Sequence, residues 1–271
     1  MKLLIKDICF SYGSHRALDN VSLEVHAGEV VSLVGPNGSG KSTMLRCIAH
    51  VLKPQQGAIY LDGREATRVS SREMARLLGY VPQLSVEIFP LTVFEAVLLG
   101  RKPYITWGVS QKDKDVVARV LKFMGIEDLA PRFLDELSGG EKQKVLIARA
   151  LAQEPEVFLF DEPTSSLDIK HQLEVLEVIR GLAIERGCSV VMVLHDLNLA
   201  SRFSDKMLLL RGGKVFAAGR PETALTPENI EAVYGVEARV TQSPFGPSVL
   251  PIRSLEATPE AGTPINAMVG S

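Results

Sequence analysis

A glycine-rich loop with one lysine and two hydroxyl residues is the stretch of this sequence best suited to chemistry. It reads Gly35-Pro36-Asn37-Gly38-Ser39-Gly40-Lys41-Ser42-Thr43 and fits the pattern G-x-x-x-x-G-K-[ST], typical of loops that hold nucleotide phosphates. Glycines leave the backbone N–H groups open to an anion, and a following helix adds partial positive charge. In this pattern Lys41 reaches the outer phosphates and the Ser42 hydroxyl binds Mg²⁺. The alternative is a glycine-rich turn that binds nothing.

The segments around this loop have the periodicities that a phosphate site needs. Residues 29–34 form a short apolar run with the composition of a buried strand. After the loop, apolar residues recur at helical spacing until Pro54 and Gly57 end the run. The glycines therefore lie between a strand and a helix, which favours the phosphate interpretation over the inert turn.

Three further polar sites follow strand-like runs elsewhere in the chain, at Gln83, at Asp161-Glu162 and at His195. In an open α/β sheet, ligands bind at the carboxyl ends of the strands. Asp161 is then expected to hold Mg²⁺, Glu162 to orient or deprotonate a water molecule, and His195 to contact the γ-phosphate. A strand-end histidine is more often simply hydrogen-bonded, so the hypothesis depends on the whole set.

A second glycine element, Leu137-Ser138-Gly139-Gly140-Glu141, opens a predicted helix but has no lysine. One interpretation is an ordinary helix cap, in which Ser138 caps and Glu141 completes a capping box. The other is a half-site that covers a nucleotide held by another copy of the chain, because its backbone N–H groups and hydroxyl suit an anion.

Composition limits the other function classes. The chain has 271 residues and a formal net charge of -2, which argues against nucleic-acid binding through bulk positive charge. Cys9, Cys47 and Cys188 are widely spaced and are expected to be reduced core thiols. Residues 1–10 lack a signal-peptide pattern, and no apolar run is long enough for a membrane span.

The pattern along the chain predicts an α/β protein with an insertion. Residues 3–26 read as an early antiparallel pair, and residues 207–218 as a hairpin. Helical patterns dominate residues 85–153, with caps expected at Thr92 and Ser138. We therefore expect a core made of residues 1–84 and 154–240. Residues 241–271 are rich in Pro, Gly, Ser and Thr and are expected to form a loosely ordered or extended tail.

With these motifs in this order, the chain resembles the nucleotide-binding subunits of ATP-binding cassette (ABC) transporters over residues 1–240. Gly35 to Thr43 is similar to the Walker A motif, Gln83 to the Q-loop glutamine, and Leu137 to Glu141 to the LSGGE signature, although Lys142 departs from its commoner continuation. The remaining matches are Val157 to Glu162 with Walker B and the catalytic glutamate, Ser166-Leu167-Asp168 with the D-loop, His195 with the switch histidine, and Tyr12 with the aromatic that stacks on adenine.

The resemblance implies a P-loop NTPase fold with a RecA-like core, an antiparallel β subdomain and an inserted α-helical subdomain. It implies an ATPase that uses ATP and Mg²⁺, with Ser42, Gln83 and Asp161 at the metal and Gln83 also in catalysis. Two copies are expected to bury ATP head to tail, with Ser138, Gly139, Gly140 and Asp168 completing the partner's site. Permease subunits would hold the chain at the cytoplasmic face of the membrane, and a solute-binding protein would take part indirectly.

A shorter segment, residues 97–104, is similar to importers of iron-siderophores, haem and cobalamin, and this gives the expected transport class. Import of zinc, manganese or molybdate, export, and a soluble ABC ATPase acting on ribosomes or DNA are the alternatives. Soluble members usually carry two cassettes, long coiled-coil arms or strongly basic segments, and this chain has none of these. Tyr104 and Trp107 either seat the membrane partner or pack the insertion.

Overall fold

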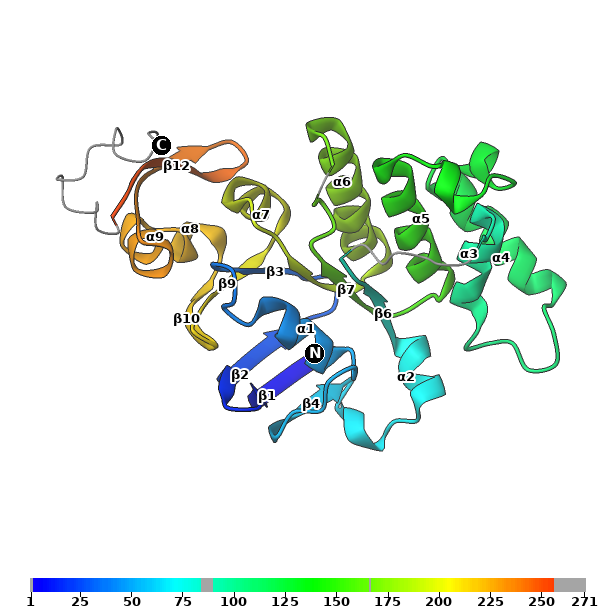
Figure 1. Ribbon diagram of the computed structural model, residues 1–271, viewed down its shortest axis with the longest axis horizontal. Coiled ribbons are helices and arrows are strands. Elements are labelled where there is room, and N and C mark those ends of the chain that lie inside the picture. The colour runs from blue at the N-terminus through cyan, green and yellow to red at the C-terminus, as the bar shows by residue number, and fades with distance from the viewer. Residues whose placement is uncertain (1, 84–89, 166, 256–271) are drawn as a thin grey trace, which may run out of the picture.

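The computed structural model describes residues 2–83, 90–165 and 167–255 (Figure 1). At its centre lies a six-stranded sheet in the order β10-β9-β3-β8-β7-β6. Its neighbouring strands run parallel except at the β9–β10 edge, which is an antiparallel hairpin. The strands are β3 (Val30–Val34), β6 (Leu78–Val81), β7 (Val157–Asp161), β8 (Ser189–Val193), β9 (Lys206–Arg211) and β10 (Lys214–Gly219).

The central strands are apolar because both of their faces are covered. Every residue of β3, β7 and β8 is buried, as expected for a parallel sheet between two layers. Alternate residues enter different cores: Val30 and Val34 join one hydrophobic cluster, and Val31 and Leu33 join the other. The first cluster includes the inserted helices and the C-terminal elements, and the second includes the first helix and the N-terminal sheet.

A four-stranded antiparallel sheet in the order β2-β1-β4-β5 covers the second cluster. It consists of β1 (Leu3–Tyr12), β2 (His15–Val25), β4 (Gln56–Leu61) and β5 (Arg64–Glu65). Nearby are the helix α1 (Lys41–Ile48), a 3-10 turn at Ala66–Arg68 and α2 (Ser71–Leu77). The early antiparallel pair expected from the sequence is confirmed by the pairing of β1 with β2.

Residues 90–156, the described part of the chain before β7, are mainly helical, and their helices lie at one end of the molecule (Figure 1). This part contains α3 (Val93–Leu98), α4 (Gln111–Phe123) and α5 (Gly139–Ala152), with 3-10 turns at Leu99–Arg101, Glu127–Leu129 and Leu134–Glu136. Thr92, Ser110 and Ser138 each form a capping box at the start of a helix. The caps expected at Thr92 and Ser138 are therefore confirmed.

The C-terminal part begins with α6 (Ile169–Arg186), which joins β7 to β8. After β8 come α7 (Leu197–Phe203), α8 (Pro221–Ala224) and α9 (Pro227–Tyr234), and the described chain closes with β11 (Val236–Ser243) and β12 (Gly246–Ser254). The hairpin expected over residues 207–218 is the β9–β10 pair.

From residue 241 the sequence predicts a loosely ordered or extended tail, and in the described part of that segment the structure has extended strands in an ordered hairpin. The boundary at residue 240 falls inside β11, which pairs with β12 as an antiparallel hairpin. Pro244 lies in the turn, and Gly246, with φ 103°, begins β12, where its carbonyl accepts from the Ser243 hydroxyl over 2.6 Å. Pro247 and Pro251 lie within β12 and pair with Gln242 and Ala238 of β11. Val249 is buried in the core, so the hairpin belongs to the folded domain. Residues 256–271 lie outside the described residues.

The cysteines agree with the expectation of reduced core thiols. Cys9, Cys47 and Cys188 are buried free thiols, and burial raises the pKa of Cys47 to about 12. In the described ranges, no helix combines the length and the hydropathy that a bilayer crossing requires.

Candidate functional site

The register of the parallel strands brings four chain segments to one edge of the sheet. Asp161 lies opposite Val193, and Val81 lies opposite Phe160. The next residues along these strands, among them Gln83, Glu162 and His195, therefore meet beside the loop that follows β3. This is the carboxyl edge, where ligands bind in open α/β sheets.

The phosphate loop runs from the end of β3 into α1, and close approach of other backbone segments requires its glycines. A Cβ on Gly35 would lie 2.2 Å from the Leu210 carbonyl oxygen, and one on Gly40 would lie 2.5 Å from that of Ala17. Gly40, the N-cap of α1, also has φ 103°. The β2 and β9 strands thus pack so closely that only glycine fits at both positions.

The Lys41 side chain is buried inside this loop. The side chain is 5% exposed, and Nζ donates hydrogen bonds to the carbonyls of Gly35 at 2.8 Å and Pro36 at 2.9 Å. Burial lowers the pKa of Lys41, while the negative charges of Glu162 and Asp161 act in the opposite direction. The ammonium group is therefore placed beside the loop's backbone, facing two carboxylates.

Ser42 and Asp161 form a pair of oxygen donors at the start of α1. The Ser42 hydroxyl donates to Oδ1 of Asp161 over 2.9 Å, and the Tyr80 hydroxyl donates to Oδ2 over 3.3 Å. Asp161 is 2% exposed, and burial raises its pKa, although both hydrogen bonds act against that shift. A carboxylate beside a hydroxyl is a hard, oxygen-only donor set, which fits Mg²⁺.

The Glu162 carboxylate lies between the side chains of Gln83 and His195. Its Oε2 accepts from Nε2 of Gln83 over 2.6 Å, and its Oε1 lies 2.5 Å from Nε2 of His195. Glu162 has φ 54°, a left-handed backbone that is uncommon outside glycine. That turn directs Glu162 away from the Ser42 contact of Asp161, so adjacent carboxylates serve different partners.

Tyr12 lies at the end of β1, 47% exposed, with its ring edge-on to Phe10 at 4.9 Å. Arg46 of α1 links it to Tyr80, whose hydroxyl contacts Asp161. Burial lowers the pKa of Arg46, but hydrogen bonds with Tyr80 and with Tyr12 outweigh that effect and raise it.

Sequence reasoning missed Tyr80 and Arg46. Tyr80 is 81 positions from its partner Asp161, and its place in a short strand carries no motif. Arg46 lies on the exposed side of α1, where an arginine is usually solvated. Only the pairing of β6 with β7 brings Tyr80 beside Asp161.

The second glycine element forms a separate site. Ser138 accepts from the Glu141 N–H while Glu141 Oε2 accepts from the Ser138 N–H at 2.8 Å and from its hydroxyl at 2.7 Å. Asp168 caps the neighbouring helix α6. Within the described ranges, no hydrogen bond or ion pair joins Ser138, Gly139, Gly140 or Asp168 to the phosphate loop.

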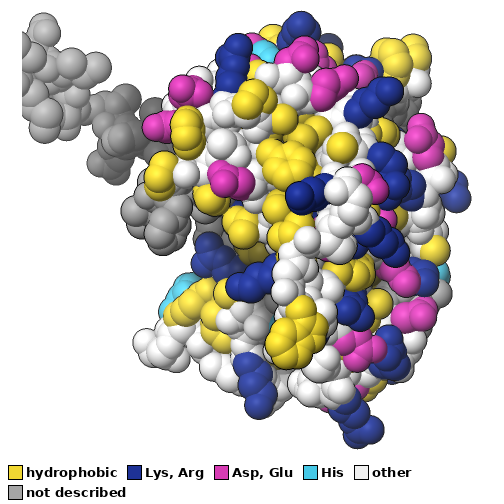
Figure 2. Space-filling view, turned by 90° about the vertical axis from the view of Figure 1, so that its right-hand side faces the viewer, with side chains coloured by type: hydrophobic (Ala, Val, Ile, Leu, Met, Phe, Trp, Pro, Cys, Tyr) yellow, Lys and Arg dark blue, Asp and Glu magenta, His cyan; other side chains and the backbone are white. Residues whose placement is uncertain are grey.

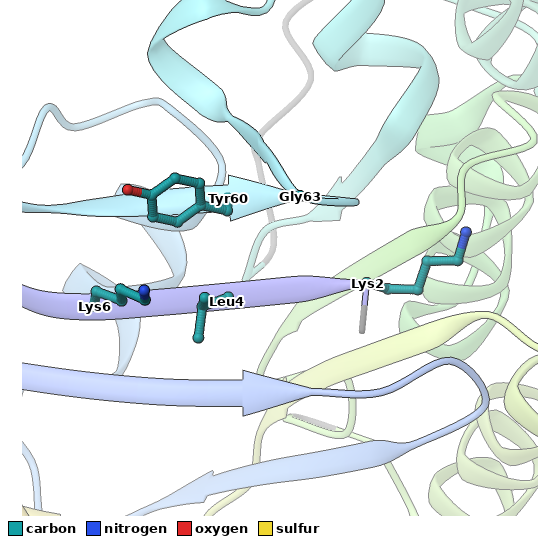
Figure 3. A pocket seen from close by; sticks show the side chains of 5 residues that line it. All are labelled: Lys2, Leu4, Lys6, Tyr60 and Gly63. Carbon is teal, nitrogen blue, oxygen red and sulfur yellow. The ribbon is translucent and has the colours of Figure 1, made fainter.

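A shallow pocket of about 260 Å³ lies elsewhere, on the N-terminal antiparallel sheet (Figure 3). Its lining comprises Lys2, Leu4, Lys6, Tyr60 and Gly63, with the Lys6 ammonium 5.6 Å from the Tyr60 ring centre. None of the candidate residues lines it, so we do not connect it with the phosphate chemistry.

Comparisons with known proteins agree with this geometry. Residues 18–165 match the model of the ABC transporter family. The chain belongs to the ABC transporter ATP-binding family. As a member, it is an ATP-binding and ATP-hydrolysing subunit of an ABC transporter.

Several relatives align along almost the whole chain. An uncharacterized ABC transporter ATP-binding protein of Methanocaldococcus jannaschii is 48% identical, with 93% of this chain and 98% of the relative covered. A petrobactin import ATP-binding protein of Bacillus anthracis is 39% identical, covering 92% of both chains. A hemin import ATP-binding protein of Gloeobacter violaceus is 42% identical, covering 88% and 89%.

Solved structures share the fold. A metal-chelate type ABC transporter in an inward-facing conformation aligns with a TM-score of 0.81 at 29% identity, covering 93% of this chain and 98% of the other. A dimeric bacterial ABC transporter cassette aligns with a TM-score of 0.73 at 34% identity, covering 81% and 98%. The P-loop ATPase fold expected from the sequence is thus confirmed.

The structure also distinguishes the two aromatic residues of the loop after α3. The Tyr104 ring packs under the guanidinium groups of Arg101 at 4.0 Å and Arg76 at 4.9 Å, and its hydroxyl donates to the Gln153 carbonyl at 3.0 Å. Trp107 is fully exposed. Tyr104 therefore packs the insertion, whereas Trp107 is free to contact another molecule.

Proposed function

We propose that this chain powers an importer of chelated metal, such as an iron-siderophore or haem complex, with cobalamin as a related cargo. The observation that carries the catalytic part is Glu162, held between Gln83 and His195 beside the Ser42–Asp161 pair. The cargo class is supported by relatives named for petrobactin and hemin import and by the metal-chelate type transporter.

In the binding step, the phosphate loop receives the triphosphate of ATP. The N–H groups from Gly35 to Thr43 and the Lys41 ammonium lie where they can take phosphate oxygens, and Tyr12 offers an exposed ring to the adenine. Ser42 and Asp161 would hold Mg²⁺, with Gln83 nearby. When bound, Mg²⁺ neutralises charge that develops on the phosphates.

In the chemical step, Glu162 orients the attacking water and accepts a proton from it at a carboxylate oxygen. His195 lies against Oε1 of the same carboxylate and fixes its direction. Gln83 holds Oε2. The Gln83 amide thus connects the residues after β6 to the carboxylate that acts on water.

A second copy of the chain would supply Ser138, Gly139, Gly140 and Asp168 to the nucleotide. This part is supported by the segment Leu137 to Glu141, which opens α5 with backbone N–H groups and a hydroxyl but contains no lysine. In the described residues it forms no hydrogen bond or ion pair with its own phosphate loop. The dimeric cassette among the structural neighbours supports it further.

Permease subunits are the proposed membrane partners, and they would hold the chain at the cytoplasmic face of the membrane. The face at the helical end of the molecule has hydrophobic side chains among many Lys and Arg side chains (Figure 2). The loop with the exposed Trp107 belongs to this helical part. A solute-binding protein would act only through the permease, and no nucleic acid is involved.

Cargo is testable by reconstitution. The chain, co-expressed with the membrane subunits encoded beside its gene, should co-purify with them, and its ATPase rate in proteoliposomes should rise with a solute-binding protein loaded with ferric siderophore or haem. Stimulation by zinc, manganese or molybdate instead would overturn the cargo class, and failure to bind any membrane subunit would overturn the transporter role.

Replacing Ser138 with arginine should prevent ATP-driven dimerisation while leaving ATP binding by the single chain intact. A bulky cation at the start of α5 blocks the close approach of a second copy's phosphates. Dimer affinity is expected to fall at least about tenfold, roughly 1.4 kcal/mol. Size-exclusion chromatography with ATP measures it.

Ser138→Ala is the matched control for Ser138→Arg, because it removes the cap hydroxyl without adding bulk. It should dimerise much more strongly than Ser138→Arg. Dimers of normal affinity in Ser138→Arg would show that this segment does not face the partner.

A further inference from the structure

We propose that His171 is a positioning residue that fixes the signature segment, Ser138 to Glu141, relative to Asp168 at the start of α6. These are the two segments that the proposed function assigns to the nucleotide of the second copy, so the inference rests on that function. His171 itself is not proposed to contact that nucleotide. It acts by joining the signature segment to Asp168.

The first link is a double contact with Asp168. The backbone N–H of His171 donates to Oδ1 of Asp168 over 2.9 Å, and the ring Nδ1 lies 2.8 Å from the same oxygen. A carboxylate only accepts, so Nδ1 carries the proton in this contact. The Asp168 carboxylate thus caps α6 and also fixes the plane of the His171 imidazole.

The second link is the packing of that ring on Gly140. A Cβ at Gly140 would lie 3.0 Å from Cδ2 and 3.1 Å from Cγ of His171, too close for an unaltered ring position. Gly140 is in the first turn of α5 and is not among the residues with positive φ. Its lack of a side chain is therefore explained by the imidazole and not by backbone conformation. A Cβ at Gly139, by contrast, would meet nothing within 4 Å.

A third contact lies one helical turn further along both helices. The Lys144 ammonium lies 2.7 Å from Oε2 of Glu174, and these residues are four and three positions after Gly140 and His171. Lys144 and Glu174 are partly exposed, so this pair alone is a weak constraint. The contact between the half-buried His171 ring and the buried Gly140 lies nearer the start of both helices, so it fixes the segments that the second copy would meet.

Without the imidazole, the start of α5 and Asp168 would lose their direct link and would be joined through the weaker Lys144–Glu174 pair one turn further along. Both must meet the second copy at once, so each lost restraint adds to the entropy that dimerisation must overcome. ATP binding by the single chain should not change, because in the described residues His171 contacts Asp168 and Gly140 and forms no hydrogen bond or ion pair with the phosphate loop.

The experiment uses full-length chain carrying Glu162→Gln, in which ATP should trap the dimer. Sedimentation with ATP and Mg²⁺ gives the dimer Kd, and a fluorescent ATP analogue without dimerisation gives the nucleotide Kd. Adding His171→Ala should raise the dimer Kd about tenfold and leave the nucleotide Kd within about twofold. Glu185→Ala, near the other end of α6, is the control and should change neither.

Two conservative variants separate the links and guard against a general folding defect. His171→Asn keeps a donor near Asp168, and His171→Phe keeps a ring against Gly140, so each should restore part of the dimer affinity. If His171→Ala dimerises as tightly as its parent, or if its nucleotide Kd rises equally, the positioning role is refuted. If the parent Glu162→Gln does not dimerise with ATP, the proposed two-copy site is refuted, and with it the basis of the His171 role.

Discussion

Replacing Glu162 with glutamine is expected to lower steady-state ATP turnover by about 10²- to 10³-fold while ATP still binds. An amide keeps the size of the side chain, and it can still meet Gln83 and His195, but it accepts no proton from water. Nucleotide should therefore accumulate unhydrolysed. Phosphate release gives the turnover, and a fluorescent ATP analogue gives the affinity.

The control for this substitution is Glu177→Gln, at an exposed position of α6. It should hydrolyse ATP at the parent rate. Near-normal hydrolysis by Glu162→Gln would mean that another group activates the water. The roles proposed for the contacts of Glu162 with Gln83 at 2.6 Å and with His195 at 2.5 Å would then be refuted.

The largest effect on stability is expected at Arg101, whose side chain is 2% exposed. Its guanidinium donates to Oδ1 of Asp113 at 3.1 Å, and to the Ala152 carbonyl and Oε2 of Glu154, both at 2.7 Å. These contacts join the 3-10 turn after α3 to α4 and to the end of α5. The cation therefore connects three parts of the helical insertion.

Arg101→Met should lower the free energy of unfolding by about 3 kcal/mol, because it leaves the buried carboxylate of Asp113 without its cation. The loss is at the low end for buried pairs, since Ser110 still donates to Asp113 through its N–H and its hydroxyl. Urea unfolding followed by circular dichroism measures it.

Lys102→Met is the neighbouring control, because Lys102 is exposed. It should change the free energy of unfolding by less than about 0.5 kcal/mol. An Arg101→Met protein as stable as its parent would show that methionine packing replaces the whole hydrogen-bonded cluster.

Local signals explain why much of the candidate site was predictable from the sequence. The capping boxes at Thr92 and Ser138 close within three residues, so the sequence contains both partners. The apolar runs of β3, β7 and β8 end at the phosphate loop, Asp161 and the residues before His195. The common rule that ligands bind at the carboxyl edge of an open α/β sheet then predicts that these strand-end residues meet.

The C-terminal hairpin was not predictable in the same way. Its Pro and Gly content suggests a loose segment, but the side-chain amide of Asn198 donates to the Val249 carbonyl at 3.2 Å and accepts from its N–H at 2.7 Å. These bonds attach β12 to α7, the helix that follows His195. Composition contains no sign of such a long-range pairing.

By itself the sequence determined the phosphate loop, the strand-end carboxylates and the helix caps, because each depends on neighbours a few positions away. The tertiary structure alone decided that Tyr80 meets Asp161, that His171 fills the space above Gly140, and that Arg101 is buried while Trp107 is exposed. These outcomes depend on how strands pair and helices pack, and such contacts join residues whose separation along the chain leaves no local pattern.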